Sequence, residues 1–152
     1  MKKNRDLVAL LLRLLDDAYE RRGWHGPNLK GSLRGVTPKQ AAFRPGPGRH
    51  SIRELVLHAA YWKYAVWRRL TGVKRGSFPL EGSNWFPRPD VPSPTEWRRD
   101  RALLEAQHRK LRAAVAALRT PPSRAMERQI YGVAAHDVYH TGQIQYVKRL
   151  QR

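Results

Sequence analysis

The chain is 152 residues long, the size of one ordinary domain, and its 41% apolar and 28% charged residues are typical of a globular protein. It contains no cysteine, which excludes disulfides, thiolate zinc sites and cysteine nucleophiles, and which fits a cytoplasmic protein. No uninterrupted run of about 18 apolar residues occurs, so we expect no membrane-spanning helix.

The formal net charge of +18 has two interpretations. It marks either a surface that binds a polyanion such as nucleic acid, or a solvated basic surface. The basic residues are spread over every segment, and no block of about five or six like charges marks a nucleic-acid-binding tail. We therefore expect any DNA binding to be weak, independent of sequence and strongly weakened by salt.

The first predicted element is a helix over about residues 3–22, which Gly23 ends. Its basic start and apolar run faintly resemble a signal peptide. Arg13, Asp16 and Asp17 interrupt that run, however, so an amphipathic helix is the better interpretation. Two adjacent apolar rows form the broad stripe of a core-facing helix: Leu7, Leu11, Leu14 and Ala18, and Val8, Leu12, Leu15 and Tyr19.

The second predicted helix covers about residues 52–70. Ser51 and Glu54 have the spacing of a capping box, and Gly72 follows as a stop signal. Its apolar face is formed by Ile52, Leu55, Ala59, Trp62, Val66 and Leu70.

The third and fourth predicted helices cover about residues 94–119 and, starting at 124 or 127, up to 150. Ser93 and Glu96 have the spacing of a second capping box, with a proline in the first turn. The long connections 23–50 and 71–93 show no alternating strand pattern, and the first contains a short helical turn at 37–40. The sequence therefore predicts a single all-α domain over residues 1–152, a four-helix bundle with two long crossover loops.

Three histidines are candidate metal ligands. His136 and His140 are four residues apart, so both rings lie on one face of the fourth helix, and His58 lies on the apolar face of the second. Three buried neutral imidazoles need partners for their ring nitrogens, and a divalent cation provides one for each. Spacing alone leaves open the alternative that these histidines bind no metal. The H-x-x-x-H pattern is common by chance, and a lone inward histidine is usually a core residue whose hydrogen bonds are satisfied.

The remaining candidates have weaker support. Asp137 follows a candidate ligand but is turned away from it by one helical step of about 100°, so it either orients His140 or another chain or is solvated, and we expect it to be solvated. Glu54 is already explained by capping. Gln143 either donates a hydrogen bond to a metal-bound ligand or is a surface amide, and both interpretations stay open. We expect His25 and His108 to be structural.

Two segments resemble the DinB/YfiT-like superfamily, the small metal-binding bundle and not the DNA polymerase that shares its name. HSIRELVLHAAYWKYAVWRRLTG is similar to the family's second helix, and AAHDVYHTGQIQYVKRL to its fourth. Residues 24–50 resemble the first crossover of one branch of the family. The resemblance implies an up-down-down-up topology, a homodimer, and zinc or nickel held by His58, His136 and His140.

The resemblance also suggests an activity, because some relatives are thiol-dependent transferases or isomerases. We expect an open three-histidine site that activates water or a thiol for a small-molecule substrate, in a hydrolase or transferase. The alternative is a basic module that binds nucleic acid and holds a structural metal. Aromatic residues of the crossovers, expected to be exposed, favour a dimer: Trp24, Trp85 and Phe86.

Overall fold

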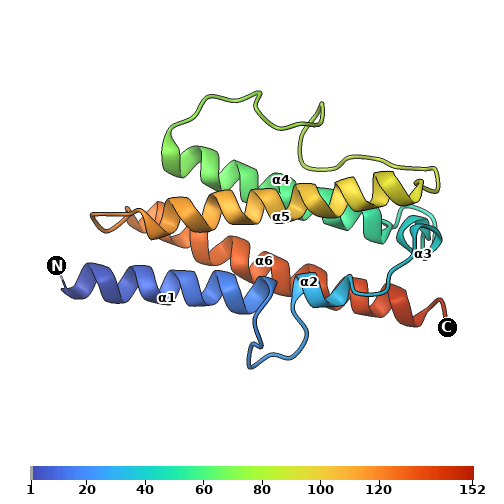
Figure 1. Cartoon of the computed structure of the whole chain (residues 1–152), viewed down its shortest axis with the longest axis horizontal. Coiled ribbons are helices and arrows are strands. Elements are labelled where there is room, and N and C mark those ends of the chain that lie inside the picture. Colours follow the sequence, from blue (N-terminus) through green and yellow to red (C-terminus); the bar gives the residue numbers. More distant parts are fainter. Residues whose placement is uncertain (1) are drawn as a thin grey trace.

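The computed structural model describes residues 2–152, and in that range the chain is all-helical, as expected. Four long helices lie side by side, and two short ones lie in the connection between the first and second of them (Figure 1). The helices are α1 (Lys2–Tyr19), α2 (Leu29–Ser32), α3 (Pro38–Ala42), α4 (Ile52–Thr71), α5 (Pro94–Ala116) and α6 (Arg124–Arg149).

The long helices form two parallel pairs. α1 and α6 run in one direction and pack on each other, while α4 and α5 run in the opposite direction and share the most extensive helix contact (Figure 1). α4 also packs on α6, and α1 on α5. α4 and α5 are parallel neighbours along the chain, so a long connection must run back along the bundle between them, and residues 72–93 supply it. The segment containing α2 and α3 joins the antiparallel helices α1 and α4. None of the described helices has the length and apolar character required to cross a membrane.

Local capping determines where the helices begin. The Ser51 hydroxyl accepts a hydrogen bond from the Glu54 amide at 3.2 Å, and the Glu54 carboxylate accepts one from the Ser51 amide, which completes the predicted capping box. The box at Ser93 and Glu96 is also present. α4 ends at Thr71, and Gly72 caps it with a φ of 73°, the left-handed conformation that glycine adopts most easily.

Two helix ends differ from the prediction. α1 ends at Tyr19 and not near residue 22, because the amides of Glu20 and Arg21 both donate to the carbonyl of Asp16 and close the last turn. α5 ends at Ala116 and not near 119. The short helix α2 was not predicted, since four residues carry no periodic pattern.

The crossover aromatics are less exposed than expected. Trp24 is fully exposed, but Phe86 is only 3% exposed and Trp85 is partly buried. Both residues pack inward in the loop 72–93, which covers α4. The expected exposure was therefore wrong for Phe86, and Trp85 is exposed only in part.

Candidate metal centre

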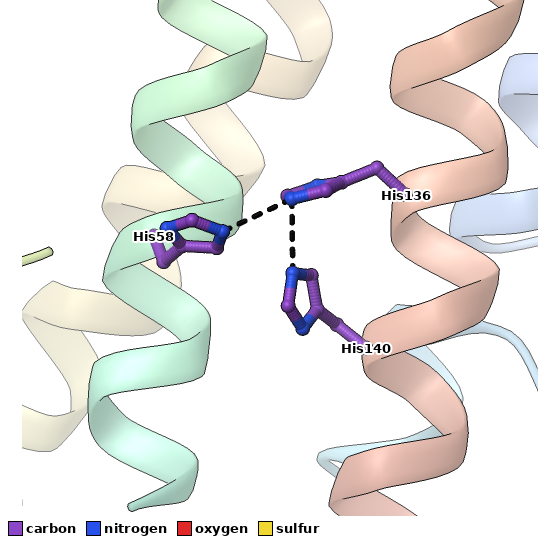
Figure 2. A group of neighbouring side chains, drawn as sticks. All are labelled: His58, His136 and His140. Atoms are coloured by element: carbon purple, nitrogen blue, oxygen red, sulfur yellow. Dashed lines mark hydrogen bonds between the residues drawn. The ribbon is translucent and has the colours of Figure 1, made fainter. Parts of the chain in front are cut away.

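The structure brings His58 of α4 together with His136 and His140 of α6 (Figure 2). The Nε2 atom of His136 lies 3.0 Å from Nε2 of His58 and 2.9 Å from Nε2 of His140. His58 and His140 are buried, and His136 is half-buried. The three Nε2 atoms therefore point at one common space between the two helices.

Hydrogen bonds to the outer ring nitrogens of His58 and His140 determine which nitrogen of these two rings is free, whereas Nδ1 of His136 is buried without a partner among the described residues. Nδ1 of His58 donates to the carbonyl oxygen of Asn84 at 2.8 Å, and Nδ1 of His140 donates to Oε1 of Gln143 at 2.6 Å. With the proton of each neutral ring on Nδ1, the Nε2 atoms of His58 and His140 carry lone pairs directed at His136. Such a second hydrogen bond is what a metal-ligating histidine usually makes.

Burial keeps the three rings neutral. It lowers the pKa of His58 to about 4 and that of His136 to about 3, and it also lowers the pKa of His140. For His136 the neighbouring rings of His140 and His58 act in the same direction. At neutral pH each ring therefore carries a single proton, and only His136 is able to carry its proton on the Nε2 atom that faces the other two rings.

This donor set fits a divalent cation. Nε2 of His136 can donate to only one of its two neighbours, so without a cation at least one close nitrogen pair has no hydrogen bond between its atoms. Imidazole nitrogen is a ligand for zinc, nickel, copper and iron. In the described residues no fourth histidine, aspartate or glutamate joins the group, and the chain has no cysteine. The set is thus a three-ligand one, as in catalytic zinc sites.

The loop 72–93 forms one wall of this site. The Trp85 ring stacks on His58 with centroids 3.8 Å apart and meets His140 edge-on. Asn84, which has a φ of 64°, contributes its carbonyl to His58, and its side chain accepts a hydrogen bond from Nε1 of Trp62 at 2.9 Å. Neither Asn84 nor Trp85 was predicted at the site, since nothing in the local sequence marks which helix a long loop will cover.

Asp137 is not solvated, contrary to the prediction. It is fully buried and forms an ion pair with Lys63 of α4, which is also fully buried. Burial raises the pKa of the Asp137 carboxyl, and the Lys63 charge opposes that rise. Lys63 was missed, although its place between Ala59 and Val66 in the apolar row of α4 is a signal of burial.

The other candidates from the sequence are Gln143, Glu54, His25 and His108. Gln143 accepts a hydrogen bond from the candidate ligand His140, whereas its amide nitrogen donates to the hydroxyl of Tyr139, so the predicted donation to a metal-bound ligand stays a prediction. Glu54 acts as a cap, as predicted, and is 1% exposed. His25 lies exposed in the turn after α1, and His108 is buried against Tyr19, with ring centroids 3.8 Å apart.

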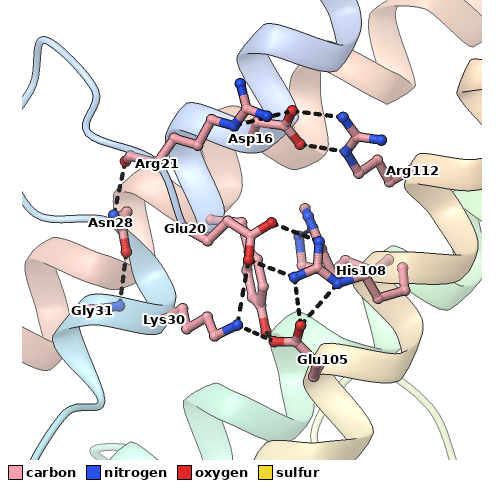
Figure 3. A network of polar contacts seen from close by, with 12 residues as sticks. Asp16, Glu20, Arg21, Asn28, Lys30, Gly31, Glu105, His108 and Arg112 are labelled. Atoms are coloured by element: carbon pink, nitrogen blue, oxygen red, sulfur yellow. Dashed lines mark hydrogen bonds and ion pairs between the residues drawn. The ribbon is translucent and has the colours of Figure 1, made fainter.

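A second group of possible ligands consists of Asp16, Glu20 and His108 (Figure 3). Its carboxylates are already neutralised by cationic side chains. Arg112 donates to both oxygens of Asp16 at 2.6 and 2.9 Å, and Arg109 donates to Glu20. We therefore assign this group to the packing of α1 against α5 and not to a metal.

Comparison with known families agrees with this geometry. A family model described as the DinB superfamily matches residues 24–144, a range that contains His58, His136 and His140. No curated protein and no solved structure matches the chain.

Proposed function

This chain belongs to the DinB superfamily, and from that premise we propose that it binds one divalent metal through His58, His136 and His140. The observation that carries the proposal is the convergence of three Nε2 atoms, two of them on rings whose Nδ1 atoms are held by protein acceptors. Such a site is prepared for a cation, because the rings are neutral and already oriented. Zinc and nickel are the metals we expect.

We further propose that the metal centre is catalytic, in a metal-dependent hydrolase or a thiol-dependent transferase. A divalent ion held by three neutral ligands supplies Lewis acidity, which lowers the pKa of water or of a thiol. Gln143 and Asn84 orient two of the rings, and Trp85 shields His58 from water. The three-ligand set supports an open position for a small-molecule substrate.

Elemental analysis of untagged protein tests the metal proposal. We expect about one divalent ion per chain, and loss of the ion in His136→Ala. His25→Ala is the matched control, because His25 is exposed in the turn after α1. Stoichiometric metal in the His136→Ala variant would contradict the assignment. Hydrolase and thiol-transfer activity that disappears on chelation would support the catalytic proposal.

We also propose the topology of the helices and the assembly of the chain. The directions and contacts of α1, α4, α5 and α6 support a four-helix bundle with up-down-down-up topology in a single domain. We also propose a homodimer in the cytoplasm. For the dimer, exposed aromatic residues remain on α6, namely Tyr131, Tyr139 and Tyr146. Sedimentation at micromolar concentration distinguishes a dimer from a monomer.

A polyanion-binding module with a structural metal is the second candidate, and the net charge of +18 favours it. Its test is DNA binding as a function of salt. Binding that is weak, independent of sequence and abolished by added salt is what a basic surface alone produces. A defined sequence preference that persists at physiological salt would place this candidate first.

A further inference from the structure

A cavity of about 530 Å³ lies between α4, α6 and residues 45–50. Its volume is within the range of about 300–1,000 Å³ in which small-molecule sites are found. The charged, polar and large apolar side chains that line it include Arg49, His50, Leu55, Gln143, Tyr146 and Val147.

Two contacts connect the cavity with the candidate metal centre. Gln143 lines the cavity and accepts the hydrogen bond from Nδ1 of His140. On the opposite side, His50 lines the cavity and stacks on Trp85 with centroids 3.5 Å apart, and the Trp85 ring also stacks on His58 at 3.8 Å. A molecule in the cavity would therefore lie against Gln143, which touches His140, and against His50, which is linked to His58 through the Trp85 ring.

The wall that carries Arg49 and His50 is held in place by Glu54. This carboxylate is 1% exposed and accepts hydrogen bonds from the Ser51 amide at 3.2 Å and the Arg88 amide at 2.8 Å. It also pairs with Arg44, whose guanidinium donates to the Arg49 carbonyl at 2.8 Å. The wall is thus fixed before any ligand arrives, which lowers the entropy lost on binding.

The chemistry of the lining indicates an anion. Arg49 carries a permanent positive charge, His50 adds an imidazole, and none of the described residues that line the cavity is acidic. Leu55 and Val147, which are 3% and 5% exposed, provide an apolar floor. A guanidinium beside an apolar surface favours a molecule that carries an acid group on an apolar body.

We propose that this cavity is the substrate subsite of the metal centre and that it binds a small organic anion. The acid group pairs with Arg49 and contacts His50, while the apolar body lies on Leu55 and Val147. The proposal rests on the proposed function, since a subsite requires a metal centre beside it. It adds the substrate class, which the family assignment does not provide.

The probe for this proposal is benzoate, with benzamide as its neutral analogue of nearly equal size. Binding is followed by amide chemical-shift changes in isotopically labelled, metal-loaded protein whose metal content has been measured separately. We expect benzoate to shift signals of Gln143 and His50, and Arg49→Gln to weaken its binding about tenfold. Arg13→Gln is the control, because this exposed residue of α1 undergoes the same change of charge.

The outcomes separate the subsite from the metal centre. Binding of benzoate that depends on Arg49 but not on Arg13, with benzamide much weaker, supports the proposal. Metal-loaded protein that binds no benzoate, or binds it equally well after Arg49→Gln, overturns the subsite and leaves the proposed function standing. Binding that depends on Arg49 in a protein that takes up no metal overturns both the subsite and the metal-binding function.

Discussion

Replacing Asp137 by asparagine would leave the ammonium group of Lys63 buried without its counter-ion. Both side chains are 0% exposed, and the other groups near the Lys63 nitrogen are Nδ1 of His108 at 3.4 Å and the ring of Tyr19 at 5.1 Å. Neither is negatively charged. Removing one partner of a buried ion pair costs about 3–5 kcal/mol, a large part of a typical unfolding free energy of about 5–15 kcal/mol.

Urea denaturation of metal-free protein measures this loss, with Glu20→Gln as the control. Glu20 pairs with Arg109 at the surface, where the side chains are 22% and 46% exposed, so its loss costs at most about 1 kcal/mol. The double variant Lys63→Met with Asp137→Leu removes both charges, and we expect its stability to equal or exceed that of the parent protein. Equal losses in Asp137→Asn and in the double variant would refute the argument, since packing and not unpaired charge would then explain both.

Two further predictions concern acid stability and one helical glycine. Burial, with the charge of Lys63 acting in the same direction, lowers the pKa of His108 to about 2, whereas an unfolded histidine titrates near 6.5. Between these values only the unfolded chain takes up this proton, so His108 alone lowers the stability by about 2 kcal/mol at pH 5, and the three histidines of the candidate metal centre add to that loss. Denaturation of metal-free protein at pH 7 and pH 5 should show a loss smaller by about 2 kcal/mol for His108→Asn, and an unchanged loss would rule out a contribution from His108. Gly142 is an exposed position of α6 where an added Cβ meets nothing within 4 Å, so Gly142→Ala should stabilise by about 0.5–1 kcal/mol. Gly72→Ala, at a φ of 73°, should destabilise instead, and melting temperatures that shift in the same direction for both would contradict this account.

The sequence alone determined those features of the protein that depend on neighbours along the chain. Ser51 and Ser93 begin helices because each cap bonds to an amide three residues later. His136 and His140 share a face because four residues make about one helical turn. His58 faces inward because it lies within the apolar row of α4, and its ring then meets the other two where α4 packs on α6.

Only the tertiary structure decided which groups from different elements meet. Asp137 is the next residue after the candidate ligand His136, and we expected it to be exposed because we assumed a single buried face on this helix. α6 in fact packs on α1, α2 and α4, which widens the buried arc of the helix. Its partner Lys63 is 74 residues away in the chain, and the wall of the site comes from Asn84 and Trp85 in a loop without periodic pattern. Such contacts depend on how the helices are rotated against one another and on the path of a long crossover, and no local spacing encodes either.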